Sequence, residues 1–204
     1  MARIYPMTSS SASTSSSSSS TISYMTSKRE TFTLWMKSLV FQGNGCTVFD
    51  SNGRIIYRID NYNKKSSSEV HLMDLQGKVL FSLRKKKFSL CGHWNGYKMD
   101  EEIPCFEVRK NGHVLWGELK YDIIFGCDIA DSDSYRIVAL QGKPGFKIVS
   151  TENTLIAEVK QKQLLSNSAV QFGDDVLSLV VEPHVDHSLV MALVTVYGLI
   201  QHML

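Results

Sequence analysis

The segment that most constrains the fold lies near the C-terminus, where apolar residues fill positions 189–200. Ten of these twelve residues are apolar, and Thr195 and Gly198 are the exceptions. Apolar side chains on every face exclude an amphipathic surface helix, and the run is shorter than the about 20 residues that span a bilayer. Asp186, just before it, is a favourable N-cap. We therefore predict a helix over about residues 186–203 that is buried inside its own protein, with insertion into a membrane as the alternative.

Before this run, short segments of alternating apolar and polar residues are separated by turn signals rich in glycine, asparagine and proline. Ile55, Tyr57 and Ile59, for example, share one face of a predicted strand. Because side chains alternate across a strand, the pattern indicates sheets with one buried face. Short strands joined by hairpins predict an antiparallel barrel or sandwich. A mostly β, antiparallel barrel that encloses the C-terminal helix accounts for both halves of the sequence.

Residues 1–27 differ in kind from the rest. Between Thr8 and Ser23, eleven of sixteen residues are serine and three are threonine. Such a stretch cannot bury apolar surface, so we predict a disordered tail over 1–27 and a single domain over 28–204. A plastid or mitochondrial transit peptide is the alternative, because such peptides are also rich in serine and poor in acidic residues. Without the apolar core of a secretory signal, we expect the protein in the cytoplasm or the nucleus.

Composition and motifs argue against several classes of function. The 22 basic and 20 acidic residues give a formal charge of +2, which is not the strongly basic balance of a dedicated nucleic-acid domain. The chain has no nucleophile elbow, phosphate-binding loop or zinc-protease motif, and its four cysteines form no C-x-x-C pair. We therefore predict no enzyme activity, no cofactor and no metal. Ordinary roles account for the isolated ligand types. Cys91 and His93 are expected to be strand residues, His184 and His187 to cap the helix or pack at its start, and Asp128, Asp131 and Asp133 to lie in a solvated loop.

Basic residues are the one chemical feature that points to a binding function. The candidate site lies at the end of one predicted strand and across the preceding hairpin, and consists of Arg84, Lys85, Lys86, Lys87, Lys64 and Lys65. Near an anionic membrane each such residue contributes about 1 kcal/mol, so the group predicts salt-sensitive binding of phosphoinositide or another anionic lipid. The alternative is that lysines at strand ends only discourage edge-to-edge association. No aromatic stacking pattern accompanies them, which argues against nucleic acid.

A family resemblance rests on segments spread over residues 32–200. They are Gly45-Cys46-Thr47-Val48-Phe49-Asp50-Ser51-Asn52-Gly53 with Tyr57-Arg58-Ile59-Asp60-Asn61-Tyr62, Leu72-Met73-Asp74 with Gly77-Lys78-Val79-Leu80, the aromatic pair Trp94 and Tyr97, and Val181-Glu182-Pro183-His184-Val185-Asp186 with Leu189-Val190-Met191-Ala192-Leu193-Val194. In this order they resemble the plant LURP-one-related family. The resemblance implies a tubby-like fold, a roughly twelve-stranded antiparallel barrel around a hydrophobic C-terminal helix, which tubby proteins and phospholipid scramblases share. The serine-rich tail is not part of the shared pattern.

The resemblance also implies a class of function, although a fold alone does not decide function. One founding member is associated with basal defence, and members are compared with tubby proteins, which are membrane-tethered transcription factors that bind phosphoinositides through basic residues. We therefore predict a monomeric, non-enzymatic, defence-linked interaction protein, peripheral at a membrane, with anionic lipid and an unidentified protein as partners. The alternative is a scramblase-like or lipid-transfer protein that engages lipid through its C-terminal helix.

Overall fold

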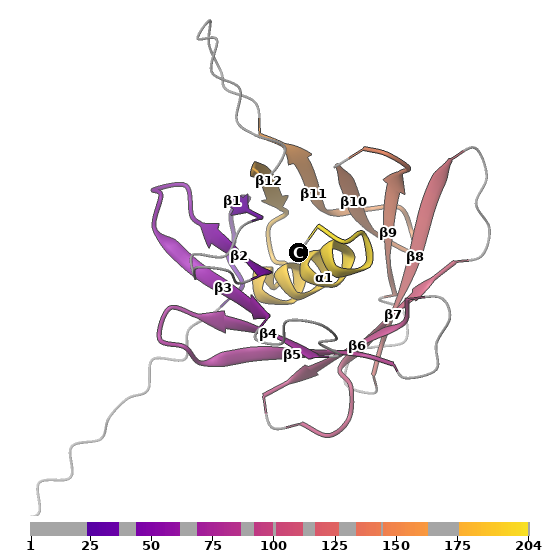
Figure 1. Cartoon of the computed structure of the whole chain (residues 1–204). Coiled ribbons are helices and arrows are strands. Elements are labelled where there is room, and N and C mark those ends of the chain that lie inside the picture. Colours follow the sequence, from indigo (N-terminus) through magenta and orange to yellow (C-terminus); the bar gives the residue numbers. More distant parts are fainter. Residues whose placement is uncertain are drawn as a thin grey trace, which may run out of the picture.

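The computed structural model describes residues 24–36, 44–61, 69–86, 92–99, 101–111, 117–126, 134–143, 145–162 and 176–203. These residues form twelve strands followed by one helix (Figure 1). The strands are β1 (Glu30–Trp35), β2 (Asn44–Phe49), β3 (Ile55–Asn61), β4 (Glu69–Asp74), β5 (Val79–Lys85), β6 (Trp94–Lys98), β7 (Phe106–Lys110), β8 (Glu118–Phe125), β9 (Tyr135–Leu140), β10 (Phe146–Ser150), β11 (Leu155–Gln161) and β12 (Val176–Val181). The helix, α1, spans His187–Ile200.

All twelve strands belong to one closed antiparallel barrel. Each strand pairs with its neighbours in sequence, and β1 closes the ring against β12 in a register that runs from Glu30 opposite Val181 to Trp35 opposite Val176. Closure leaves no sheet edge unpaired, which removes a route to aggregation. The predicted fold class, a mostly β, twelve-stranded antiparallel barrel with a C-terminal helix, is confirmed.

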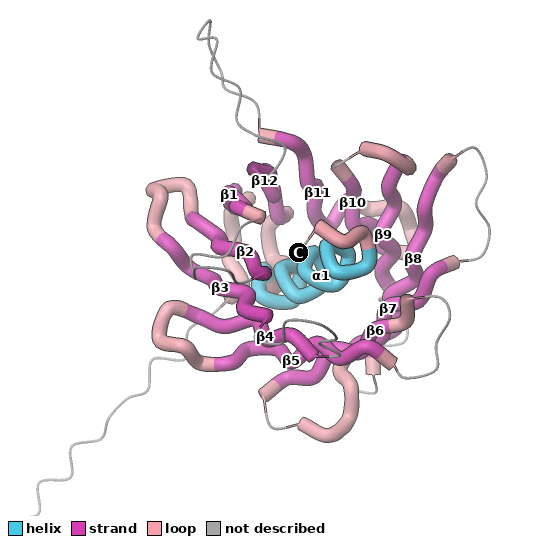
Figure 2. The backbone as a smooth tube through the Cα atoms, viewed as in Figure 1, coloured by secondary structure: helices cyan, strands magenta, loops and turns pink. Residues whose placement is uncertain are grey.

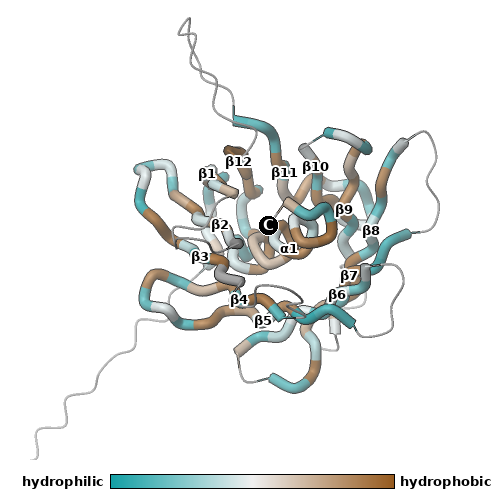
Figure 3. Tube along the Cα trace, viewed as in Figure 1, coloured by the Kyte–Doolittle hydropathy of each residue, from teal (hydrophilic) through white to brown (hydrophobic). Residues whose placement is uncertain are grey.

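The helix fills the barrel (Figures 1 and 2). Residues 190–197 are each at most 5% exposed, and inward-facing strand residues such as Tyr57 and Ile59 pack around them. Thr195 is the polar residue inside this run, and its hydroxyl donates to the Met191 carbonyl at 2.8 Å, as a buried hydroxyl requires. Figure 3 shows the hydrophobic helix within the ring of strands. In the part of the chain that the structure describes, no helix combines the length and the apolar character needed to cross a membrane.

Local interactions set both ends of α1. Asp186 is the N-cap, and its Oδ1 accepts from the Ser188 and Leu189 amides at 2.8 and 3.3 Å. The helix ends at Ile200, three residues before the predicted limit of 203. His202 adopts a left-handed φ of 56°, and the Met203 amide bonds back to the Gly198 carbonyl at 2.8 Å. This arrangement satisfies carbonyls that would otherwise lack partners, and it terminates the helix.

The barrel has two rims, which we name by the helix. The start rim is the one at which the even-numbered strands end and α1 begins, because α1 follows β12. The stop rim is the opposite one, at which the odd-numbered strands end. Ile200 at the end of α1 lies against Gly92 in the connection between β5 and β6, so the helix runs from the start rim to the stop rim.

Residues 24–29 lie along the start rim. Met25 forms a β-bridge with Asp186, and the Tyr24 carbonyl accepts from the His187 amide at 2.9 Å. Arg29 pairs with Glu182 at 3.0 Å. The boundary that we expected between residues 27 and 28 therefore falls within a segment that contacts the barrel, while residues 1–23 of the predicted tail lie outside the described residues.

Candidate functional site

The structure divides the predicted basic site between different environments. Arg84 lies on the outer face of the barrel, where its Nε is 2.9 Å from Glu69 Oε1 and its guanidinium carbon is 4.7 Å from the centre of the Tyr97 ring. An arginine held by a carboxylate and an aromatic ring is less available to an external anion. Arg84 therefore mainly stabilises the sheet surface through these contacts, and it contributes less to a binding site.

Lys85 and Lys86 have more open surroundings at the stop rim. Lys85 is paired with Trp94, an inward-facing residue, so it points along the inner edge of the rim, whereas Arg84 lies outside. Lys86 follows directly, with its amide bonded to the His93 carbonyl at 2.9 Å. Both lysine side chains are exposed, and neither has an ion-pair partner among the residues that the structure describes. The other three candidates, Lys64, Lys65 and Lys87, lie outside the described residues.

The described residues of the two rims differ in charge. At strand ends and connections within the described residues, the stop rim has five lysines and two glutamates: Lys85, Lys86, Lys110, Lys143, Lys162, Glu69 and Glu118. On the same basis, the start rim has eight carboxylates and five basic residues: Glu30, Asp50, Asp74, Glu101, Glu102, Glu152, Glu182, Asp186, Lys28, Arg29, Arg54, Lys78 and Lys98. Such a separation of charge directs anions to the stop rim and cations to the start rim.

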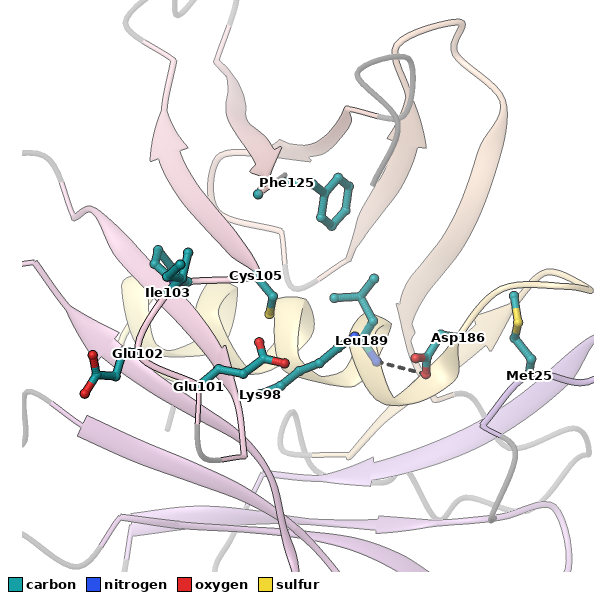
Figure 4. A pocket seen from close by; sticks show the side chains of 11 residues that line it. Met25, Lys98, Glu101, Glu102, Ile103, Cys105, Phe125, Asp186 and Leu189 are labelled. Carbon is teal, nitrogen blue, oxygen red and sulfur yellow. Dashed lines mark hydrogen bonds between the residues drawn. The ribbon is translucent and has the colours of Figure 1, made fainter. Parts of the chain in front are cut away.

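A pocket of about 570 Å³ opens at the start rim, beside the beginning of α1 (Figure 4). Its walls come from the connection between β6 and β7, the end of β8, the start of α1 and Met25. Leu189, Phe125 and Cys105 are among the apolar lining residues. Sequence reasoning missed this pocket, although the connection contains one signal of it, namely the exposed apolar residue Ile103 among charged neighbours.

The cysteine that lines the pocket is unsuited to nucleophilic chemistry. Burial raises the pKa of the Cys105 thiol to about 11, with Glu101 opposing the thiolate and Lys98 favouring it less strongly than burial disfavours it. The thiol donates to the Gly96 carbonyl at 3.2 Å. A thiol that stays protonated at neutral pH is a weak nucleophile. Cys46, inside the barrel, is equally inert, because burial raises its pKa to about 12.

Next to the pocket, His187 joins α1 to three other elements. Its Nδ1 is 2.6 Å from the hydroxyl of Tyr57 on β3, and its ring packs against Phe32 of β1 and Tyr24. Burial lowers the pKa of His187 and raises that of Tyr57, so both groups favour the neutral form and share this hydrogen bond. The packing role that we predicted for His187 agrees with this arrangement.

The other candidate metal ligands do not assemble into a site within the described residues. No group of three histidine, cysteine or acidic side chains there is arranged to hold a metal ion. His93 lies just before β6 and contacts Glu107 Oε2 at 3.1 Å. Cys91, Cys127 and the three aspartates at 128, 131 and 133 lie outside the described residues.

Comparisons with known proteins identify the family. The sequence model of the LURP-one-related family matches residues 30–198, which include all twelve strands and nearly all of α1. The chain belongs to the LURP-one-related family.

The similarity of this LURP-one-related protein to its relatives extends beyond the barrel. It is 41% identical to Protein LURP-one-related 4 of Arabidopsis thaliana, over 98% of this chain and 87% of that protein. It is 42% identical to Protein LURP-one-related 3 of the same plant, over 98% of this chain and 92% of the relative. The predicted family resemblance is confirmed.

A solved structure shares the fold. The X-ray structure of an Arabidopsis thaliana protein superimposes on the LURP-one-related chain with a TM-score of 0.60 at 14% sequence identity. The match covers 84% of this chain and 90% of the other. The structural match supports the shared fold. Because the sequence identity is low, the match carries no statement about function.

Proposed function

We propose that this LURP-one-related protein is a non-enzymatic interaction protein that binds anionic membrane lipid at its stop rim. The observation that supports this most directly is the pair of exposed lysines, Lys85 and Lys86, which have no ion-pair partner among the described residues. They stand at the rim where lysines outnumber carboxylates among the described residues. Each lysine near an anionic surface contributes about 1 kcal/mol, so binding depends on several of them together.

A binding role also agrees with the chemistry of the described side chains. The two described cysteines, Cys46 and Cys105, have raised pKa values and are poor nucleophiles. The proposal includes a peripheral location at a membrane facing the cytoplasm or the nucleus, and the link to plant defence and to tubby-like regulators that the family resemblance implies. For that location and that link, family membership is the support.

The alternative, a scramblase-like or lipid-transfer protein, needs its C-terminal helix to contact lipid. In the barrel the side chains of residues 190–197 are at most 5% exposed. Contact with lipid would require the barrel to open and its own apolar lining to meet water, at about 25 cal/mol for each Å² exposed. The geometry therefore favours electrostatic binding by the rim over insertion of the helix.

Co-sedimentation with phosphoinositide-containing liposomes tests the proposal. We expect the wild-type protein to bind at low salt and to be released at high salt, because the attraction is between exposed charges. The variant Lys85→Ser/Lys86→Ser should lose most of the binding. Arg84 is left in place because its contacts with Glu69 and Tyr97 also stabilise the sheet. The wider variant Arg84→Ser/Lys85→Ser/Lys86→Ser/Lys87→Ser should abolish binding.

A matched control removes two lysines from the other rim. Lys28 and Lys78 are exposed at the start rim, so Lys28→Ser/Lys78→Ser changes the net charge equally and should bind liposomes like the wild type. Equal losses in both double variants would mean that net charge, and not the stop rim, is responsible. Binding that resists both salt and mutation would favour the helix instead, and no binding at all would refute the proposal.

A further inference from the structure

The stop-rim proposal does not use the pocket at the start rim. Its volume of about 570 Å³ lies in the range of about 300–1,000 Å³ that is usual for small-molecule sites. Figure 4 shows Cys105, Phe125 and Leu189 around the same space; they come from the connection between β6 and β7, from β8 and from α1. Three elements that are distant in sequence thus form one apolar wall.

The mouth of the pocket carries apolar side chains that are exposed to solvent. Ile103 is 73% exposed, and Met25 is 54% exposed. Clusters of large exposed apolar residues on soluble proteins commonly mark binding sites. Here they continue the apolar lining outward to the surface.

Charged groups at this mouth favour a cation. Glu101 and Glu102 are exposed carboxylates without an ion-pair partner among the described residues, and Lys98 is the opposing ammonium group. Asp186 adds a third carboxylate, but it is engaged in capping the helix. The local balance is therefore negative, in agreement with the charge of the described residues at the start rim.

An anion finds few donors in the same pocket. The start of α1 would ordinarily offer free amides to an anion. Here the His187 amide is bonded to the Tyr24 carbonyl, the Ser188 and Leu189 amides to Asp186 Oδ1, and the Val190 amide to the Asp186 carbonyl at 3.1 Å. Each of these donors is occupied within the protein. Among the charged side chains that line the pocket, Lys98 is the one that attracts an anion.

We propose that this pocket binds small amphiphilic molecules with an apolar body and a cationic, ammonium-type head. The body lies against Leu189, Phe125 and Cys105, and the head lies at the mouth near Glu101 and Glu102. The Cys105 thiol serves as apolar wall, so the pocket binds its ligand without a covalent step. This site is separate from the stop rim and does not depend on lipid binding there.

Three probes with the same eight-carbon chain test the preference: octylammonium, octanol and octanoate. Titration of the full chain, followed by calorimetry and by amide chemical shifts, should show octylammonium binding with one-to-one stoichiometry. We expect it to bind at least about tenfold more tightly than octanoate, with octanol between them, because the head-group charge changes from attracted to repelled. The shifts should concentrate in residues 98–105, 125–126 and 186–189.

Variants separate the charge from the apolar wall. Glu101→Gln/Glu102→Gln alters two exposed side chains and should remove the preference for octylammonium while octanol binding is retained. The matched control Glu118→Gln/Glu152→Gln removes two carboxylates elsewhere and should keep the preference. Cys105→Phe should fill the pocket and weaken all three probes. Ile103→Ser, at a position that is 73% exposed, should weaken all three by a few fold without a folding defect.

Several results would overturn the pocket assignment. They are binding of octanoate as tight as that of octylammonium, shifts concentrated away from the pocket residues, or no binding of any probe. Lys85→Ser/Lys86→Ser should bind octylammonium like the wild type, so failure of the lipid proposal and failure of this one give different results.

Discussion

At the scale of single residues, Gly96 shows how closely the interior is packed. Gly96 on β6 is directly opposite Phe106 on β7, and the Phe106 ring lies over the glycine where a side chain would otherwise stand. Phe106 is fully buried and its ring packs against that of Phe81 at 6.1 Å between centroids. The ring therefore lies within a closely packed interior.

The variant Gly96→Ala should consequently destabilise the fold. A methyl group there overlaps the Phe106 ring, and overpacking of this kind costs about 1–3 kcal/mol. Urea unfolding of the wild type and the variant measures the loss.

A second substitution distinguishes overlap from a backbone effect. Phe106→Leu makes room for the methyl group, so the loss caused by Gly96→Ala should be smaller in the Phe106→Leu background. Equal losses in both backgrounds would show that the ring is not the reason.

At the scale of elements, strand alternation explains why a consecutive basic run does not form one surface. Arg84 and Lys85 are neighbours on β5, yet one lies outside with Glu69 and Tyr97 and the other lies in register with the inward-facing Trp94. Successive side chains of a strand point to opposite faces. Consecutive basic residues within a strand are therefore divided between its two faces, and the sequence overstates how close their charges lie. Lys86 is not subject to this rule, because β5 ends at Lys85.

The start of α1 provides a prediction about an element boundary. Asp186→Ala removes the acceptor of the Ser188 and Leu189 amides and of the buried Ser188 hydroxyl at 2.6 Å. Loss of an N-cap costs about 0.5–2 kcal/mol, and we expect the upper part of this range because Ser188 is buried. Thermal or urea unfolding measures it.

Asp186→Asn is the conservative control, because the asparagine oxygen can accept the same hydrogen bonds. It should retain most of the stability of the wild type. An asparagine variant as unstable as the alanine variant would show that the charge of Asp186, and not its capping geometry, stabilises the helix start.

At the scale of the whole molecule, His187 links the closure of the barrel to pH. It lies where the N-terminal segment, β1, β3 and α1 meet, and the charged groups around it are Asp186 and Glu30. Burial lowers the pKa of His187, and these two carboxylates offset the effect only in part. In the folded protein His187 therefore binds a proton less readily than in the unfolded chain, where the pKa of a histidine is about 6.5.

Stability should fall as the pH decreases below about 6.5, because the unfolded state then binds more protons than the folded state. The contribution is fully present above the unfolded pKa and is lost as the pH falls toward the lowered folded pKa. Urea unfolding between about pH 5 and pH 8 measures the slope. The variant His187→Gln should have a smaller slope in this window, and an unchanged slope would assign the effect to other groups.

Much of the architecture was predictable because it rests on short-range periodicity. The apolar run at 189–200 has no polar face, so it had to be buried, and the period-2 alternation at Tyr57 and Ile59 required a sheet around it. Asp186 was recognisable as a cap for a similar reason, since capping depends on residues within one turn. The end of α1 at Ile200 also has a local cause, namely the left-handed conformation of His202. That conformation was not predictable, because it is uncommon for a residue other than glycine.

Only the tertiary structure decided where the chemistry lies. The pocket combines Met25, Cys105, Phe125 and Leu189, whose separation in sequence exceeds any local pattern. The pairing of Arg84 with Glu69 depends on the register between β4 and β5, and the difference in charge between the rims depends on which connections the antiparallel order brings together. Sequence periodicity specifies which face of each element is buried. The neighbours across that face are set by register and closure, because these follow from the packing of the whole barrel around its helix.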